Sequence, residues 1–258
     1  MNLIHVFLLS LTEGLTEFLP ISSTGHMILM SKLLGITETN FVKTFEIVIQ
    51  LGAIMAVVVL YFKRLVTGSD LVKKLFVAFI PTAIVGFTLY PLIKEVLLGS
   101  SAITLNALFW GGIAIIFVEK ILKKSKSQIS NLKSTEPTYG QALIIGTFQS
   151  VSVIPGVSRA AATIVGGLLT GLNRKTATEF SFLLAVPTMF AATGLDIYKS
   201  RHMITQGGFL TLFMGTIFSF FFAMLAIKFL INYVKKHNLT AFGIYRIVLA
   251  VLFWLFVK

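Results

Sequence analysis

A succession of apolar segments limits what this chain can fold into. Several of them approach the ~20 residues that an α-helix needs to cross the hydrocarbon core of a bilayer. Hydrophobic residues make up 56% of the 258 residues, whereas soluble domains contain roughly 45–50% apolar residues. We therefore predict an all-α polytopic membrane protein, with residues 1–258 forming a single membrane domain. The apolar segments cover about 2–19, 21–34, 41–62, 75–93, 102–122, 138–154, 156–172, 176–198, 208–231 and 240–257.

The two halves of the sequence resemble each other weakly. A polar, basic loop at 123–137 separates them, and Glu17–Thr24 aligns with Ser152–Arg159, 135 positions later. Each half contains a proline-broken pair of short segments, followed by three longer segments. Because three crossings per half is an odd number, the sequence predicts an inverted-topology repeat. The repeats would cover about 1–122 and 138–258 and would be joined by a cytoplasmic loop.

The proline-broken segments are short for membrane crossings. A helical arm of about 14 residues, such as 21–34, rises only about 21 Å, less than the ~30 Å hydrocarbon core. The pairs 2–34 and 138–172 are therefore predicted to be two re-entrant helical hairpins, which leaves about six transmembrane helices. Charges at membrane depth are tolerable near one another or near a shared ligand. Since these hairpins carry such charges, we expect them to enter from opposite sides and to meet near the middle.

Positive charge is divided unequally between the two sets of connecting loops. Cytoplasmic loops of membrane proteins carry the excess of lysine and arginine. The richer side is therefore predicted to be cytoplasmic, with both termini outside. The net charge of +12 then suits lipid headgroups, and no nucleic-acid partner is expected. The richer side carries Lys63, Arg64, Lys73, Lys74, Lys123, Lys124, Lys126, Lys133, Arg174, Lys175, Lys235 and Lys236, and the other side carries Lys32, Lys43, Lys94, Lys199, Arg201 and Lys258.

The first apolar segment contains two carboxylates where charge is least expected. Glu13 and Glu17 are four residues apart, so on a helix they share one face. Their repulsion and burial must be offset by a cation, by a proton on one carboxyl group or by water. A divalent cation, Mg²⁺ or Ca²⁺, suits oxygen ligands and substrate phosphates. The alternative without chemistry is a polar helix face in a pore or an interface.

Three hydroxyl residues follow Pro20, which breaks the first helix. Ser22, Ser23 and Thr24 are good N-cap types, so a second helix is predicted to begin here. Its free N–H groups and its dipole form a ready anion site. His26 lies three residues after Ser23, on the same helical face. This combination of residue types indicates phosphate chemistry inside a membrane.

A second motif, at 155–163, begins with a Pro-Gly turn. Ser158 can cap the following helix, and Arg159 opens that helix and shares a face with Thr163. An arginine at a helix N-terminus opposes the helix dipole, so a bound anion would relieve the conflict. The guanidinium fork also suits bidentate phosphate binding. The candidate substrate-binding residues are therefore Ser22, Thr24, Ser158, Arg159 and Thr163.

The two motifs together resemble a known family. Glu13-Gly-Leu-Thr-Glu-Phe-Leu-Pro-Ile-Ser-Ser-Thr-Gly-His26 and Pro155-Gly-Val-Ser-Arg159 are similar to the motifs of the undecaprenyl-diphosphate phosphatase family of the bacitracin-resistance type. The resemblance covers nearly the whole chain, including Glu46–Gln50 and Glu179–Pro187. It implies hydrolysis of the membrane lipid undecaprenyl diphosphate to undecaprenyl phosphate and phosphate outside the cytoplasm, at a site that opens to the outer face of the inner (plasma) membrane. That reaction recycles the lipid carrier of cell-wall peptidoglycan synthesis and confers bacitracin resistance.

The resemblance also implies roles for individual residues. Glu13 and Glu17 would form the acidic motif, Ser23 and His26 would be catalytic, and Arg159 would bind phosphate. The family usually has serine directly after the arginine, whereas this chain has Ala160, so no role for that hydroxyl group can be transferred. Three more residues, predicted to orient the site rather than to react, are Glu46, Gln50 and Glu179.

Several alternatives stay open at this point. Ser23 can be an N-cap only, His26 can be merely hydrogen-bonded to a neighbour, and Arg159 can form a plain salt bridge to Glu13 or Glu17. The attacking group is either Ser23 or a water molecule activated by the metal or by His26. A lipid-phosphate transporter or flippase would need the same intramembrane charges. Homo-oligomerisation is left open, and Arg246 is placed near a membrane edge without a special role.

Overall fold

The computed structural model describes the chain except residues 38, 90–96, 98–99, 125–135, 201–207 and 257–258. The described residues form helices and no strand. Most of the predicted joining loop lies outside them, as do Lys94, Lys126, Lys133, Arg201 and Lys258. The helices are α1 (Leu3–Thr16), α2 (Ser23–Leu33), α3 (Asn40–Thr67), α4 (Ser69–Thr88), α6 (Ser101–Lys124), α8 (Tyr139–Ser150), the 3₁₀ turn η2 (Val151–Val153), α9 (Arg159–Leu169), α10 (Arg174–Ser200), α11 (Phe209–Val234) and α12 (Thr240–Phe256).

The predicted all-helical membrane class is confirmed. Among the described residues, four helices, namely α3, α4, α6 and α11, are long and apolar enough to cross a bilayer. Helix α10 has 27 residues and α12 has 17. By contrast, α1, α2, α8 and α9 have 14, 11, 12 and 11 residues. At 1.5 Å per residue each of these short helices is about 21 Å long or less, and cannot cross a ~30 Å core alone.

The pattern of short helices repeats in the two halves. Helix α2 begins at Ser23 and α9 begins at Arg159, and both have 11 residues. These starting points are 136 positions apart, one more than the 135 of the sequence alignment. The alignment matched Ser23 with Ser158, whereas the structure matches Ser22 with Ser158, because these two residues cap the corresponding helices. A run of adjacent cap-type residues does not reveal which of them is the cap.

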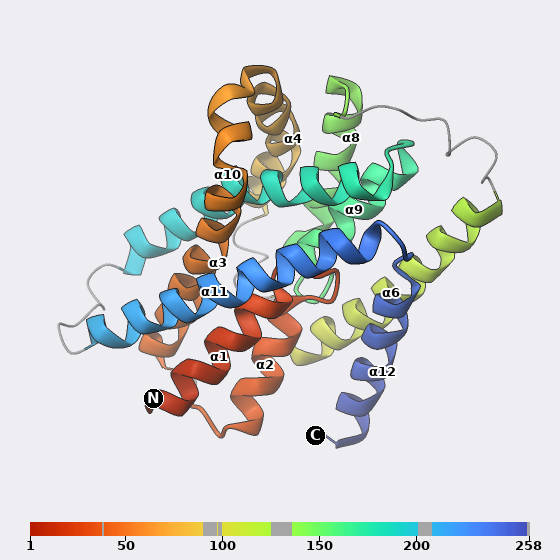
Figure 1. Ribbon diagram of the computed structural model, residues 1–258. Coiled ribbons are helices and arrows are strands. Elements are labelled where there is room, and N and C mark those ends of the chain that lie inside the picture. Colours follow the sequence, from red (N-terminus) through yellow and green to blue (C-terminus); the bar gives the residue numbers. More distant parts are fainter. Residues whose placement is uncertain (38, 90–96, 98–99, 125–135, 201–207, 257–258) are drawn as a thin grey trace.

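The short helices bring their connecting turns into the interior (Figure 1). Helix α1 packs on α2 and α11, while α8 packs on α9 and α4. Helix α11 also crosses α3, and α6 pairs with α12. In Figure 1 the α1–α2 pair occupies the lower part of the molecule and α8 the upper part, with both termini on the lower side. The core between them includes Phe18 and Phe182, whose rings meet edge to face at 5.4 Å.

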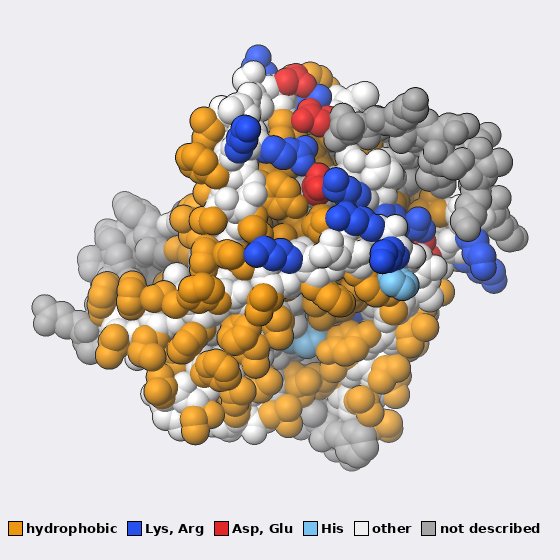
Figure 2. All heavy atoms as spheres, in the orientation of Figure 1, with side chains coloured by type: hydrophobic (Ala, Val, Ile, Leu, Met, Phe, Trp, Pro, Cys, Tyr) orange, Lys and Arg blue, Asp and Glu red, His pale blue; other side chains and the backbone are white. Residues whose placement is uncertain are grey.

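Basic side chains gather on one part of the surface (Figure 2). They cover much of the upper part of the face shown, while hydrophobic side chains cover most of the lower part. Ion pairs connect several residues of this basic region: Arg64 contacts Glu179 at 2.7 Å and Glu136 at 3.7 Å, and Lys74 contacts Glu136 at 3.6 Å. Residues assigned to the richer side of the membrane from sequence therefore lie together in space.

Candidate functional site

The turn after α1, which we call the first tip (Pro20–Ser23), has an unusual backbone. Ser22 has φ 71° and ψ 100°, and its side-chain oxygen accepts from the N–H of Gly25 at 3.5 Å. A positive φ at a residue other than glycine costs about 1–3 kcal/mol, so surrounding contacts must hold it. The turn directs the start of α2, and therefore Ser23, toward the interior of the protein.

The turn before α9, the second tip (Gly156–Arg159), repeats this geometry. Ser158 has φ 71° and ψ 114°, and its side-chain oxygen accepts from the N–H of Ala161 at 3.2 Å. Gly156 has φ 92°, and a Cβ atom there would collide with the carbonyl oxygen of Thr104 on α6. Only glycine meets both demands, so this residue allows the second tip to press against α6.

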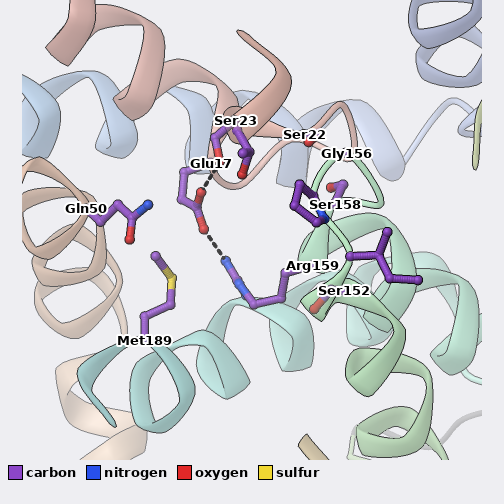
Figure 3. A pocket seen from close by; sticks show the side chains of 12 residues that line it. Glu17, Ser22, Ser23, Gln50, Ser152, Gly156, Ser158, Arg159 and Met189 are labelled. Atoms are coloured by element: carbon purple, nitrogen blue, oxygen red, sulfur yellow. Dashed lines mark hydrogen bonds and ion pairs between the residues drawn. The ribbon is translucent and has the colours of Figure 1, made fainter. Parts of the chain in front are cut away.

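A cavity of about 190 Å³ lies between the two tips. Figure 3 shows Glu17 between Ser23 and Arg159, with Gln50 and Met189 on the opposite side. Two helix N-termini, those of α2 and α9, border this tip cavity, and first-turn N–H groups lack partners within their own helix. The tip cavity is lined by Glu17, Ser22, Ser23, Thr24, Gln50, Ser152, Ile154, Pro155, Gly156, Ser158, Arg159 and Met189.

Glu17 connects the two tips. Its Oε2 accepts a hydrogen bond from the Ser23 hydroxyl group, and its Oε1 accepts from Nη2 of Arg159 at 3.1 Å. Arg159 also donates from Nη1 to the carbonyl oxygen of Ser181 at 3.2 Å, and its buried Nε has no protein partner. The salt bridge considered from sequence is therefore present, and it leaves one buried N–H group beside the cavity without a partner.

Glu13 lies next to Glu17, as the four-residue spacing predicts. Its side chain is buried, at 1% exposure, and it lies against the Glu17 carboxyl group, with Glu46 and Arg159 also nearby. Its Oε1 is buried without a hydrogen-bond partner. Within the described ranges no cluster of three or more His, Cys, Asp or Glu side chains could hold a metal ion by itself. Glu13 is not among the residues that line the tip cavity. Its unpaired oxygen and the adjoining Glu17 carboxylate are nevertheless of the ligand type that Mg²⁺ combines with substrate phosphates.

His26 faces away from the tip cavity. Its Nδ1 lies 2.7 Å from the carbonyl oxygen of Ser22, and its Nε2 lies 2.7 Å from the hydroxyl group of Tyr245 on α12. A carbonyl oxygen only accepts, so Nδ1 carries the proton and Nε2 accepts from Tyr245. The rings of His26 and Tyr245 also stack, 4° from parallel. His26 therefore supports the strained Ser22 turn, and its two hydrogen bonds go to Ser22 and Tyr245 rather than to Ser23.

Two other predicted residues lie in different surroundings from those expected. Thr163 is fully buried, and its hydroxyl group pairs with that of Ser181 at 2.6 Å, behind Arg159 rather than in the tip cavity. Glu179 lies in the second turn of α10 and pairs with Arg64 in the basic region. It is not among the residues that line the tip cavity. Glu46 accepts from Ser31 at 3.4 Å.

Arg246 is the largest omission of the sequence interpretation. It is 0% exposed, and all five of its N–H donors meet carbonyl oxygens. Two of these belong to α6, and three belong to the tips. A Cβ at Gly111 would collide with the guanidinium group, so glycine makes room for it. The five acceptors are Ala107 (3.0 Å), Leu108 (3.3 Å), Pro20 (3.4 Å), Gly156 (2.9 Å) and Val157 (2.8 Å).

A signal for Arg246 was present in the sequence. It interrupts the apolar segment 240–257, and an ionisable residue inside such a segment usually has a specific partner. Nη1 of Arg246 reaches the carbonyl oxygens of both Pro20 and Val157. One nitrogen atom thus joins the first tip to the second, in agreement with the expectation that the tips meet. Tyr245, the preceding residue, was also missed.

Comparisons with known proteins agree with this arrangement. The sequence model of the family described as bacitracin resistance protein BacA matches residues 6–252. A protein of Persephonella marina named undecaprenyl-diphosphatase is 52% identical over 257 residues, covering 100% of both chains. Proteins of Wolinella succinogenes and Aquifex aeolicus with the same name are each 49% identical, covering 98% and 95% of this chain and 97% and 94% of their own. The chain therefore belongs to the bacitracin resistance protein BacA family.

Proposed function

We propose that the tip cavity is the site at which this membrane enzyme hydrolyses undecaprenyl diphosphate to undecaprenyl phosphate and inorganic phosphate. The protein is an undecaprenyl-diphosphatase of the bacitracin-resistance type, which recycles the lipid carrier of cell-wall synthesis. The observation that supports the site is the Ser23–Glu17–Arg159 chain of contacts between the tips. It combines a nucleophile, a base and a phosphate-binding cation in one cavity.

Ser23 is the proposed nucleophile and Glu17 its base. The Ser23 hydroxyl group already donates to Glu17 Oε2, so Glu17 can take the proton as Oγ attacks the terminal phosphorus. The bond between that phosphorus and the bridging oxygen breaks, and undecaprenyl phosphate leaves. A water molecule then hydrolyses the phosphoserine, which releases inorganic phosphate and restores the hydroxyl group. Since His26 contacts Ser22 and Tyr245, its role is to position the turn.

Positive groups on both sides of the cavity stabilise the transferring phosphoryl group. The unpartnered Nε of Arg159 supplies a donor, and the guanidinium charge offsets the growing negative charge. The first turns of α2 and α9 add backbone N–H groups and helix dipoles from two directions. Ser22 and Ser158 keep these turns in place, and Thr24 and Gln50 complete the polar wall.

Glu13 and Glu17 would hold a divalent cation, Mg²⁺ or Ca²⁺, together with the substrate phosphates. When bound, such a cation supplies Lewis-acid stabilisation of the phosphoryl oxygens. The unpaired Oε1 of Glu13 supports this assignment, since a buried carboxylate oxygen is costly without a partner. Glu46 would orient Glu13 from the neighbouring helix α3.

The membrane arrangement forms part of the proposal. About six transmembrane helices and two re-entrant hairpins, arranged as inverted repeats of 1–122 and 138–258, would place the tip cavity near mid-membrane. The basic region would face the cytoplasm of the plasma membrane, and the cavity would open to the outer face. The chain has no cysteine, so an Ile21→Cys/Val157→Cys pair would carry its only thiols. Cross-linking of this pair by a short thiol reagent is expected, and its complete failure would contradict meeting tips.

A phosphate-release assay tests the function directly. Purified protein in detergent should release inorganic phosphate from undecaprenyl diphosphate, and the rate should fall in excess chelator and recover when Mg²⁺ or Ca²⁺ is added. A lipid transporter with the same charges would release none. An undiminished rate in chelator would refute the metal proposal while leaving the Ser23 proposal intact.

A further inference from the structure

A second, larger cavity of about 580 Å³ lies where α6, α9, α10 and α11 end or begin. We call it the basic cavity. It shares no lining residue with the tip cavity, and nothing in the proposed hydrolysis uses it. Its lining residues are Glu119, Leu122, Lys123, Leu168, Leu172, Asn173, Arg174, Lys175, Val234, Lys235, Lys236, His237 and Asn238.

The floor of the basic cavity is an ion pair whose carboxylate is buried. Glu119 on α6 is 4% exposed and pairs with Arg174 at the start of α10. Its Oε1 also accepts from the backbone N–H of Leu239, at 2.9 Å, just before α12. One carboxylate thus fixes three helices around the cavity, and the charge of Arg174 is largely balanced by it. The shape of the floor is therefore held by the protein itself.

The remaining lining charge is positive. Four lysines, Lys123, Lys175, Lys235 and Lys236, surround the mouth of the cavity. The N-termini of two helices also lie at this cavity. At the start of α10, the Asn173 side chain accepts a hydrogen bond from the N–H of Thr176 at 2.9 Å. The Asn238 side chain accepts likewise from the N–H of Thr240 at 3.1 Å, at the start of α12. Helix N-termini favour anions, whereas the C-termini of α6, α9 and α11, which also end at this cavity, favour cations. The preference for an anion therefore depends mainly on the four lysines.

The other walls are apolar. Leu122, Leu168, Leu172 and Val234 line the cavity beside the lysines. The neighbours Ile121 on α6 and Leu169 on α9 are each 45% exposed, which continues the apolar surface outward from the cavity. Leu168, Leu172 and Val234 are at most 5% exposed, so acyl chains would lie mainly along the exposed residues Ile121 and Leu169. A free anion would gain nothing from that apolar surface. The combination therefore fits an amphiphilic anion.

We propose that the basic cavity binds the phosphate headgroup of an acidic phospholipid, with the acyl chains along α6 and α9. Basic pockets between membrane helices bind such headgroups in general, and the charge distribution predicts that this end faces the cytoplasmic leaflet. The bound lipid would join the ends of α6, α10 and α11. This makes the basic cavity a lipid site separate from the catalytic one.

Native mass spectrometry of the whole protein in detergent tests this proposal. The probes are phosphatidylglycerol, phosphatidylcholine with the same acyl chains, and inorganic phosphate. Wild-type protein should retain one phosphatidylglycerol in preference to phosphatidylcholine. Lys235→Gln/Lys236→Gln should weaken that binding about tenfold, since each lysine near a lipid phosphate contributes several-fold. Both lysines are exposed at a helix end, so folding should be preserved.

The matched control is Lys63→Gln/Lys73→Gln, which removes the same charge from exposed positions of the basic region outside the cavity. It should retain wild-type lipid binding. If both double variants bound phosphatidylglycerol equally weakly, overall charge would explain the loss of binding, and the proposal would be overturned. Equal retention of phosphatidylcholine would also overturn it, as would displacement of phosphatidylglycerol by inorganic phosphate at equal concentration.

Discussion

The two tips have nearly the same backbone and different chemistry. Ser22 and Ser158 share φ 71° and cap α2 and α9 in the same way. The next residue, at the first helical position, is Ser23 in one tip and Arg159 in the other. At this position one tip thus offers a hydroxyl group and the other a cation.

The segments before the two tips also differ in chemistry at corresponding positions. At the 136-residue offset, Glu13 corresponds to Gln149 and Glu17 to Val153. Gln149 is buried like Glu13, and each has an Oε1 without a partner. However, Gln149 is neutral and donates to Thr82 and Thr188 at 2.9 and 3.0 Å. Of the two hairpins, only the first therefore contributes carboxylates to the site. Two hairpins with the same backbone can thus supply different functional groups to one site.

The two buried arginines extend this comparison. Arg246 has a carbonyl acceptor for each of its five donors, so it is satisfied without a ligand. Arg159 has an unpartnered Nε beside the cavity, so it still has bonding capacity for one. Leaving a buried donor unsatisfied costs about 1–3 kcal/mol. We interpret the first arginine as a clamp between the tips and the second as the phosphate ligand.

The largest expected effect comes from the hydroxyl group that distinguishes the first tip. Ser23→Ala should lower turnover at least about a thousandfold if Ser23 is the nucleophile. Ser22 caps the helix, so the protein should stay folded. The measurements are phosphate release and the thermal unfolding temperature. Trapping of a phosphoserine at Ser23 in wild-type protein would establish the covalent step, whereas a near-normal rate of Ser23→Ala would favour direct attack by water.

The corresponding change in the second tip is Arg159→Lys, which keeps the charge and removes the fork. Lysine cannot pair with Glu17 and a phosphate in the same planar geometry. Turnover should fall roughly a hundredfold or more, as for loss of one transition-state donor. Arg174→Lys, outside the tip cavity, is a control for the general effect of such a replacement. A rate of Arg159→Lys within about twofold of wild type would refute the role of Arg159 as the phosphate ligand.

Arg246→Lys tests whether the tips need the carbonyl clamp. An ammonium group has three donors and cannot reach five carbonyl oxygens in a plane. We expect turnover to fall up to about a hundredfold, because a shift of about 1 Å at a site can cost that much. Unlike Arg159→Lys, this variant should also lower the yield of the Ile21→Cys/Val157→Cys cross-link. An unchanged cross-link yield would show that Arg246 does not hold the tips together.

Much of this difference between the tips could be predicted from sequence. Glu13 and Glu17 needed only helical spacing, and Ser23 and Arg159 needed only the presence of a turn and a helix start. The role of Arg246 could not be predicted, because its partners lie as far as 226 positions away and are carbonyl oxygens, which leave no pattern in the side chains. The same holds for Glu179, whose partner Arg64 is 115 positions away, and for the tautomer of His26, which depends on Tyr245.

A smaller loss of turnover is expected from a change at Glu13, whose counterpart in the second hairpin is the neutral residue Gln149. Glu13→Gln makes this position resemble Gln149 and keeps the side-chain shape. Because it removes one of two charges that would hold a cation, turnover at saturating Mg²⁺ should fall about tenfold and the Mg²⁺ concentration for half-maximal rate should rise. Gln149→Glu is the reciprocal control and should leave that Mg²⁺ requirement unchanged. An unaltered requirement in Glu13→Gln would argue against a cation at this carboxylate.

The smallest effect should come from Tyr245→Phe, which addresses a feature that only the first tip has. The position that corresponds to His26 in the second hairpin is Ala162, and the second tip keeps the same backbone without an imidazole. If His26 only supports the Ser22 turn, removing its second hydrogen bond should change turnover by less than about threefold, within the ~0.5–1.5 kcal/mol of one hydrogen bond. The pH profile of turnover should also keep its shape, because the ring would take no part in proton transfer. If Tyr245→Phe instead moves one limb of the pH profile, His26 exchanges protons with the substrate, and Glu17 is not the only base in the tip cavity.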